Sequence, residues 1–147
     1  MTTTGQDSTE TRTAVDGVLA AHGHLYLATA HDGRPWVSGV YFAETSTFEL
    51  AVVLETHGRT LTALRANPHA AVVVSSGSPH EPFLQGAATV EVLDGTAAED
   101  AHRALLAKVP QIEQFLQYPH EAVRLSVSLW RITDVTRGWI PARTLTG

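Results

Sequence analysis

Much of the chain alternates apolar and polar residues with a period of two, and this pattern limits the folds that it can adopt. In the segment 123–129 the apolar residues Val123, Leu125, Val127 and Leu129 alternate with arginine and serine. The same spacing, or a short apolar run, recurs in segments 24–31, 36–43, 48–54, 70–76 and 84–93. Because strand side chains point alternately to opposite faces, we expect six or more strands with one buried face, and we expect Leu129 to face the core.

Short turns and a few helices connect these segments. Asp32-Gly33 supplies the positive φ angles of a tight hairpin, and residues 44–47 form a second turn. Helical spacing predicts a helix that starts at Thr13, a short one over 58–67, and a third that opens on a Thr96/Glu99 capping box before Pro110 ends or kinks it. The fold class is therefore α+β, mainly β: an antiparallel barrel of six to seven strands with two or three flanking helices.

Composition narrows the function classes. Zero cysteines in 147 residues exclude disulfide scaffolds, thiolate metal sites and cysteine nucleophiles. A net charge of −5 without a basic run argues against nucleic acid, and no apolar run is long enough to span a membrane, so we expect a cytoplasmic protein. Only 17% of the residues are charged, which suggests a surface covered by a partner subunit. Residues 1–12 are polar enough to form a flexible tail before one domain over 13–147.

A set of ordered features points to a known family. These features are a strand ending in Ala28-Thr29, the Asp-Gly-Arg-Pro turn at 32–35, a Trp-Val-Ser strand over 36–42, a helix ending at 64–68, and Gln-Gly-Ala-Ala at 85–88. In this order they resemble the pyridoxamine 5'-phosphate oxidase-like flavin-binding split barrels. The resemblance implies a homodimer with FMN at the subunit interface, and an oxidoreductase that transfers hydride or electrons to a small-molecule substrate.

The segment 55–68 holds the best anion site in the sequence. A strand that runs into a helix at Gly58 leaves backbone N–H groups free, and Arg59 and Thr60 add a charged and a neutral donor. Arg59 is also compatible with a solvated arginine at a helix end, but the resemblance favours a phosphate ligand. Many family members have a lysine in this loop, whereas the only lysine here is Lys108, so either Arg59 substitutes or the affinity is lower.

The resemblance adds further contact candidates. In the family the second strand lies beside the flavin ring, although Trp36 would serve equally well as a core aromatic and Gln85 as a surface amide. The ending 137–147 lacks a clear match to the substrate-binding tail of true pyridoxamine phosphate oxidases, so vitamin oxidation is not expected. The complete set of expected cofactor-binding residues is Trp36, Val37, Ser38, Thr56, His57, Arg59, Thr60, Gln85 and Trp139.

Other ligands and functions stay open. The eight histidines form no metal-ligand motif, so no metal site is expected, although some relatives of this fold bind haem. Haem and deazaflavin are therefore alternatives to FMN, and a cofactor-free dimeric binding protein is the non-catalytic alternative. Hydrolase motifs such as GxSxG and HExxH are absent from the sequence. Flavin chemistry needs no protein nucleophile, so no catalytic residue is assigned.

Overall fold

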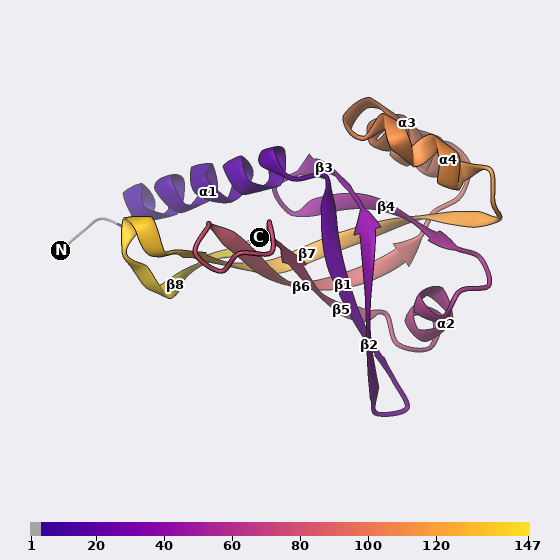
Figure 1. Cartoon of the computed structure of the whole chain (residues 1–147), viewed down its shortest axis with the longest axis horizontal. Helices are drawn as coiled ribbons and strands as arrows, with labels where there is room; N and C mark the ends of the chain where they lie inside the picture. The colour runs from indigo at the N-terminus through magenta and orange to yellow at the C-terminus, as the bar shows by residue number, and fades with distance from the viewer. Residues whose placement is uncertain (1–3) are drawn as a thin grey trace.

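The computed structural model describes residues 4–147 and contains eight strands in one antiparallel sheet (Figure 1). The strands are β1 (His24–His31), β2 (Arg34–Tyr41), β3 (Ala43–Ser46), β4 (Glu49–Glu55), β5 (His69–Val74), β6 (Phe83–Val92), β7 (His120–Asp134) and β8 (Trp139–Thr146). The helices are α1 (Thr4–Ala21), α2 (Arg59–Ala66), α3 (Gly95–Lys108) and the single turn α4 (Glu113–Leu116), with 3₁₀ turns η1 (Pro110–Ile112) and η2 (Val135–Arg137). The predicted fold class, α+β and mainly β, is confirmed.

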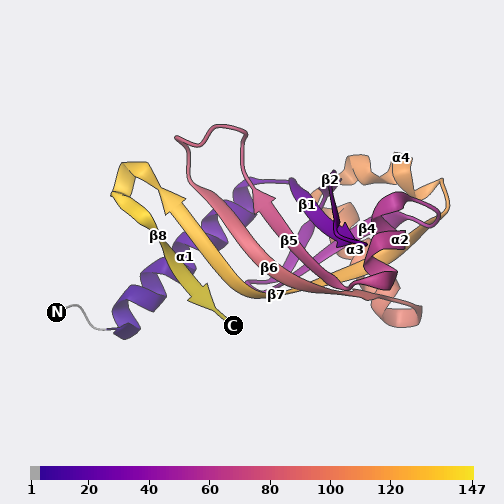
Figure 2. The same ribbon diagram turned by 90° about the horizontal axis from the view of Figure 1, so that it is seen from below.

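The strand order shows why the sheet curls. The hydrogen-bonded order is β2-β1-β5-β6-β7-β4-β3, with β8 paired to β7 at one end. The two outer strands of this order, β2 and β3, are joined by a single residue, Phe42, which is buried and whose N–H donates to the carbonyl of Gly23. The sheet therefore bends round until its first and last strands meet. It forms a split barrel, and Figure 2 shows β5, β6 and β7 side by side along its length.

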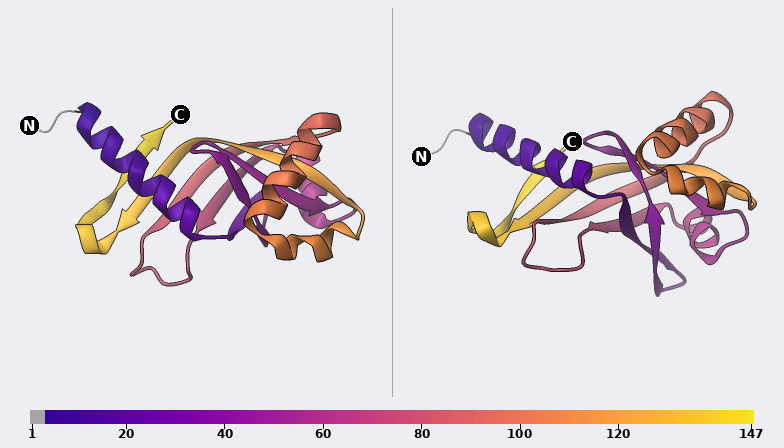
Figure 3. Two further views of the ribbon diagram at one scale, coloured as in Figure 1. Left: turned by 90° about the horizontal axis from the view of Figure 1, so that it is seen from above. Right: turned by 45° about the horizontal axis from the view of Figure 1, so that its top comes forward.

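Helices close the barrel at its two ends (Figure 3). α1 lies at the end that carries β8, and the main core fills the space between this helix and the inner face of the sheet. α3 and α4 cover the other end, where Ala101, Leu105 and Val109 of one helical stripe form a second, smaller core with Ile112. α2 lies near this second end, beside β1 and β2.

The first helix is longer than predicted. α1 begins at Thr4 rather than Thr13, so the expectation of a flexible tail over residues 1–12 is wrong for residues 4–12, whereas residues 1–3 lie outside the described part. Tertiary contacts explain the extension, because Arg143 donates to the Glu10 carboxylate at 3.2 Å and one face of the helix is buried. Its buried residues are Thr11, Ala14, Val15, Val18 and Leu19. No helix between residues 4 and 147 is long and apolar enough to cross a membrane.

Two predicted turns have different outcomes. The hairpin between β1 and β2 turns at Asp32 and Gly33, with φ angles of 51° and 71°, as the Asp-Gly pair predicts. The second turn is not at 44–47, because β3 continues to Ser46 and Ser46 pairs with Glu49.

The capping-box prediction for the third helix is also wrong: Asp94, not Thr96, is the N-cap of α3, and no side chain caps the helix. Pro110 does follow the end of α3, as expected.

A bulge in β7 reverses the alternation of buried residues. The β6–β7 register pairs Ala87 with Leu129 but Ala88 with Val127, so Ser128 is an extra residue on β7. Beyond it the buried residues are Trp130 and Ile132, and Leu129 is only partly buried. The expectation that Leu129 faces the core is therefore wrong, because one inserted residue changes the phase of every side chain that follows.

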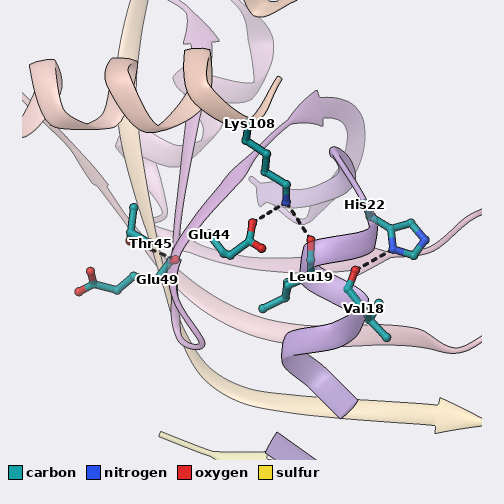
Figure 4. A network of polar contacts seen from close by, with 7 residues as sticks. All are labelled: Val18, Leu19, His22, Glu44, Thr45, Glu49 and Lys108. Atoms are coloured by element: carbon teal, nitrogen blue, oxygen red, sulfur yellow. Dashed lines mark hydrogen bonds and ion pairs between the residues drawn. The ribbon is translucent and has the colours of Figure 1, made fainter. Parts of the chain in front are cut away.

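Lys108, the only lysine of the chain, joins three elements (Figure 4). Its Nζ donates to the carbonyl of Leu19 in the last turns of α1 at 2.8 Å and to the carboxylate of Glu44 in β3. The same ammonium lies 4.0 Å from the centre of the Phe42 ring. The side chains of Lys108 and Glu44 are only 20% and 25% exposed. The contact fastens α3 to α1 and β3 and places a cation at a helix C-terminus, where the dipole favours it.

We expect Lys108→Met to lower the free energy of unfolding by about 1–3 kcal/mol, because Glu44 and the Leu19 carbonyl lose their partner. Urea denaturation followed by circular dichroism measures the change. Arg103→Met is the matched control on the same helix, because the Arg103–Asp100 ion pair is exposed and should contribute less than about 1 kcal/mol. Equal losses in the two variants would contradict this role of Lys108.

Candidate functional site

A cleft of about 1030 Å³ runs along the edge strand β2. Its walls are formed by β1 and β2, the end of β4, the start of α2, and the segment from η1 to the first residue of β7. These elements meet because the barrel is split between β2 and β4, which are not hydrogen-bonded to each other. The cleft therefore lies where the sheet fails to close.

Strand pairing decides which side chains of β2 face α2. Trp36 pairs with Thr29 and Ser38 with Leu27, so both β2 side chains point to the same side as those two buried β1 residues. Val37 lies between them, points to the opposite face, and is 62% exposed. Trp36 and Ser38 line the cleft, whereas Val37 does not.

One end of the cleft is suited to an anion. α2 begins at Arg59 after an extended Gly58, and no side chain caps it, so its first backbone N–H groups have no helical partner. The Arg59 guanidinium carbon lies 3.9 Å from the centre of the Trp36 ring, and no ion pair among residues 4–147 includes Arg59. The hydroxyls of Ser38 and Thr60 are 2.6 Å apart. This end thus combines an unpaired cation, two hydroxyls and free amides.

The Trp36–Arg59 pair also borders a second, smaller cavity. This cavity of about 430 Å³ lies toward the β1–β2 hairpin and is lined by His31 and Arg34 as well. The stacked pair therefore stands between two openings. A planar guanidinium over an indole ring is held in place while its N–H groups stay available for a ligand.

The other end of the cleft is aromatic. The rings of Tyr41 and Phe115 have centroids 5.8 Å apart, and Tyr118 also lines this end. Phe115 and Tyr118 are 47% and 66% exposed. Sequence reasoning missed this group. No signal in the sequence marks these residues, because the strand that carries Tyr41 has no buried positions and the stretch after Pro110 has no periodicity that marks Phe115 or Tyr118.

Two histidines meet beside this aromatic end. His102 of α3 and His120 of β7 have their Nε2 atoms 3.1 Å apart, and His120 lines the cleft. The Nδ1 atom of His120 is 2.7 Å from the carbonyl of Tyr118. Because a carbonyl only accepts, this Nδ1 carries the hydrogen, and the Nε2 of neutral His120 is left to accept from His102. Burial, and to a smaller degree electrostatic repulsion from His120, lowers the pKa of His102 below its ordinary value.

The predicted site residues fall into two groups. Trp36, Ser38, Arg59 and Thr60 come together in the cleft. Of the others, Thr56 donates its hydroxyl to Glu121 at 3.4 Å beside the loop that leads to α2, and neither it nor the exposed His57 lines the cleft.

Val37, Gln85 and Trp139 do not line the cleft. Gln85 is exposed on β6 in the middle of the sheet. Trp139 is buried in the main core, flanked by Arg137 and Arg143. It is the first residue of β8, a strand that lies at the end of the molecule opposite α2 (Figure 1). The cleft of a single chain does not bring these three residues, or Thr56 and His57, to a bound cofactor. Their contact with a cofactor stays a prediction.

Comparison with known proteins decides the family. The family model of pyridoxamine 5'-phosphate oxidase matches residues 11–134, from α1 to the end of β7. The chain belongs to the pyridoxamine 5'-phosphate oxidase family. The resemblance drawn from the ordered features of residues 24–88 is thereby confirmed.

Solved structures share the fold of this pyridoxamine 5'-phosphate oxidase family member at low identity. A haem-binding protein from Mycobacterium smegmatis has a TM-score of 0.79 at 18% identity, with 92% of this chain and 57% of that protein covered. A Clostridium acetobutylicum protein of the pyridoxinephosphate oxidase family, related to general stress protein 26, has a TM-score of 0.73 at 10% identity, with 93% of this chain and 94% of that protein covered. An FAD-binding protein from Mesorhizobium loti has a TM-score of 0.64 at 22% identity, with 78% of this chain and 86% of that protein covered.

These likenesses establish the split barrel for this chain. The chain spans little more than half the length of the haem-binding protein. No curated protein sequence matches the chain.

Proposed function

We propose that this chain binds FMN in the cleft beside β2 and acts as a flavin-dependent oxidoreductase on a small-molecule substrate. The observation that carries the proposal is Arg59, a cation without an ion-pair partner among the described residues, in the first turn of an uncapped helix and in the same cleft as Trp36 and Ser38. A phosphate satisfies both the guanidinium and the free amides, and an aromatic ring system fits the apolar remainder of the cleft.

The chain's own residues have separate tasks in this proposal. Arg59 holds the phosphate through parallel N–H donors, and the α2 amides and the Thr60 hydroxyl complete its hydrogen bonds. Ser38 positions Thr60 through their 2.6 Å contact. Trp36 fixes Arg59 by stacking and shields the bound ring from water. The flavin ring itself supplies hydride or electron transfer, so the protein contributes binding, orientation and electrostatics.

A homodimer fits the exposed edge of the sheet. β2 is an outer strand, and its Val37 is among the most exposed large apolar side chains of the described residues. Uncovered edge strands invite pairing, and the cleft opens along this same edge. A second chain that covers β2 would both protect the edge and close the cleft, in agreement with the low charged fraction of the sequence.

Haem is the alternative with an observation in its favour. His24 and His120 line the cleft, and imidazole is a common axial ligand of haem iron. One protein of similar fold, from Mycobacterium smegmatis, is a haem-binding protein. FMN is preferred because the uncapped helix and Arg59 suit a single phosphate.

Titration of the purified full chain tests the proposal. FMN, haem and a deazaflavin are added separately, and flavin fluorescence and visible absorption are followed. We expect FMN to saturate at one per chain, and light scattering to give a dimer. A shift of the haem Soret band without FMN binding would identify haem, not FMN, as the cofactor. Binding of deazaflavin alone would identify deazaflavin as the cofactor. Binding of none would leave a cofactor-free binding protein, and a monomer would remove the shared site.

A further inference from the structure

The His102–His120 pair has the geometry of two metal ligands. The histidines are 18 residues apart in the sequence, and their Nε2 atoms lie 3.1 Å from each other. Their ring centroids are 5.1 Å apart with the ring planes at 73°, so the rings meet through their nitrogen-bearing edges rather than by stacking. This arrangement lies at the aromatic end of the cleft, away from Arg59, and the proposed FMN site does not use it.

The separation of the nitrogens matches a shared ion. Bonds from Zn²⁺ to imidazole nitrogen are about 2.0–2.1 Å long, so two such bonds that meet at about 90–110° hold their nitrogens about 2.9–3.4 Å apart. The observed 3.1 Å falls within this range. An ion can therefore take the place of the shared hydrogen without separating the two nitrogens, once the rings turn their Nε2 lone pairs towards it and the proton of His102 moves from Nε2 to Nδ1.

The surroundings hold His120 ready to bind through Nε2. Its Nδ1–H donates to the carbonyl of Tyr118 at 2.7 Å, which fixes the tautomer and leaves the Nε2 lone pair free. Metal-bound histidines usually donate their second ring N–H to a carbonyl or carboxylate in this way. Both histidines stand on regular elements, His102 next to the buried Ala101 of α3 and His120 at the start of β7. The pair is thus preorganised by the fold.

We propose that His102 and His120 bind one divalent transition-metal ion, of the kind that prefers imidazole, through their Nε2 atoms. No third His, Asp or Glu joins them in a metal-binding group within residues 4–147, so water fills the remaining positions. Such a ligand set favours Cu²⁺, Zn²⁺ or Ni²⁺ over Mg²⁺, which prefers oxygen. Because His120 lines the cleft, the ion borders it, and an oxygen of a molecule in the cleft can take a water position.

The test measures Zn²⁺ binding to the full chain by calorimetry, without added flavin. We compare the wild type with His102→Gln, His120→Gln and the control His80→Gln, which removes an exposed loop histidine. Loss of an orienting partner alone costs about 10- to 100-fold in affinity, so loss of either ligand should weaken binding at least about tenfold. We expect one Zn²⁺ per chain in the wild type and in His80→Gln, and no binding of Mg²⁺.

A second measurement does not depend on how the variants fold. Electron paramagnetic resonance of the wild type with one equivalent of Cu²⁺ should show coupling to two imidazole nitrogens. A spectrum with one or no coupled nitrogen would overturn the proposal, as would unchanged Zn²⁺ affinity in a folded His102→Gln or His120→Gln protein. In either case the pair is a hydrogen bond between two histidines and nothing more. Because no flavin or haem is present, failure here leaves the FMN proposal unaffected.

Discussion

Trp130→Ala is expected to lower the free energy of unfolding by about 3–5 kcal/mol, the largest change that we predict for a single residue. Trp130 is fully buried in the main core, and its Nε1–H donates to the carbonyl of Thr47 at 2.7 Å. Truncation removes the ring, opens a cavity inside the barrel, and leaves that carbonyl without its partner. Urea denaturation measures the loss. Trp36→Ala serves as the control, because Trp36 is partly exposed and its truncation should lower the free energy of unfolding less. A loss below about 1 kcal/mol for Trp130→Ala would contradict this role.

The neighbour of Trp130 allows a sharper version of this test. Gly86 faces Trp130 across the β6–β7 pair, and a Cβ at this glycine would lie 2.6 Å from Cζ3 of the ring. Gly86→Ala alone should therefore cost about 1–3 kcal/mol through overpacking. In the double variant the small side chain enters the space that the indole leaves, so the combined loss should be smaller than the sum. Strict additivity would show that the two residues do not share this space.

Arg59→Ala is expected to weaken FMN binding about 10- to 100-fold, because hydrogen bonds to a charged group contribute about 1.5–3 kcal/mol. The side chain is exposed, so the free energy of unfolding without ligand should change little. Arg65→Ala is the matched control: it removes the same charge from the last turn of the same helix and does not line the cleft. Fluorescence titration gives the two affinities. An equal loss in both variants would mean that general charge, not the position of Arg59, attracts the ligand.

Local signals explain how much of the fold could be predicted from the sequence. The strand over 24–31, the Asp32-Gly33 turn and the helix at 59–66 each depend on neighbours a few residues away, and each appears in the structure. The errors arise where residues far away in the sequence determine a strand register or a helix boundary. The extra residue Ser128 follows from how β7 pairs with β6, and the early start of α1 follows from packing against the barrel and the Glu10–Arg143 contact.

The same division holds for the candidate site. Arg59 and Thr60 could be predicted as an anion site because a strand-to-helix turn is visible in the sequence, whereas Trp36 and Ser38 are expected beside the same ligand only because the family resemblance implies it. The aromatic end and the His102–His120 contact depend on how α3, η1 and α4 fold against β7, which no periodicity encodes. Lys108 illustrates the point as well. Its role in joining α3 to α1 and β3 arises from residues 64 and 89 positions away.

The affinity of the wild-type protein for FMN relative to riboflavin is the most direct test of the proposed phosphate site. The two ligands share the ring and the ribityl chain and differ only in the phosphate, so their ratio isolates the contribution of Arg59, Thr60 and the start of α2. We predict that FMN binds at least about tenfold more tightly than riboflavin, and that Arg59→Ala removes most of this preference. Equal affinities for the two ligands in the wild type, or a preference that survives in Arg59→Ala, would contradict the assignment.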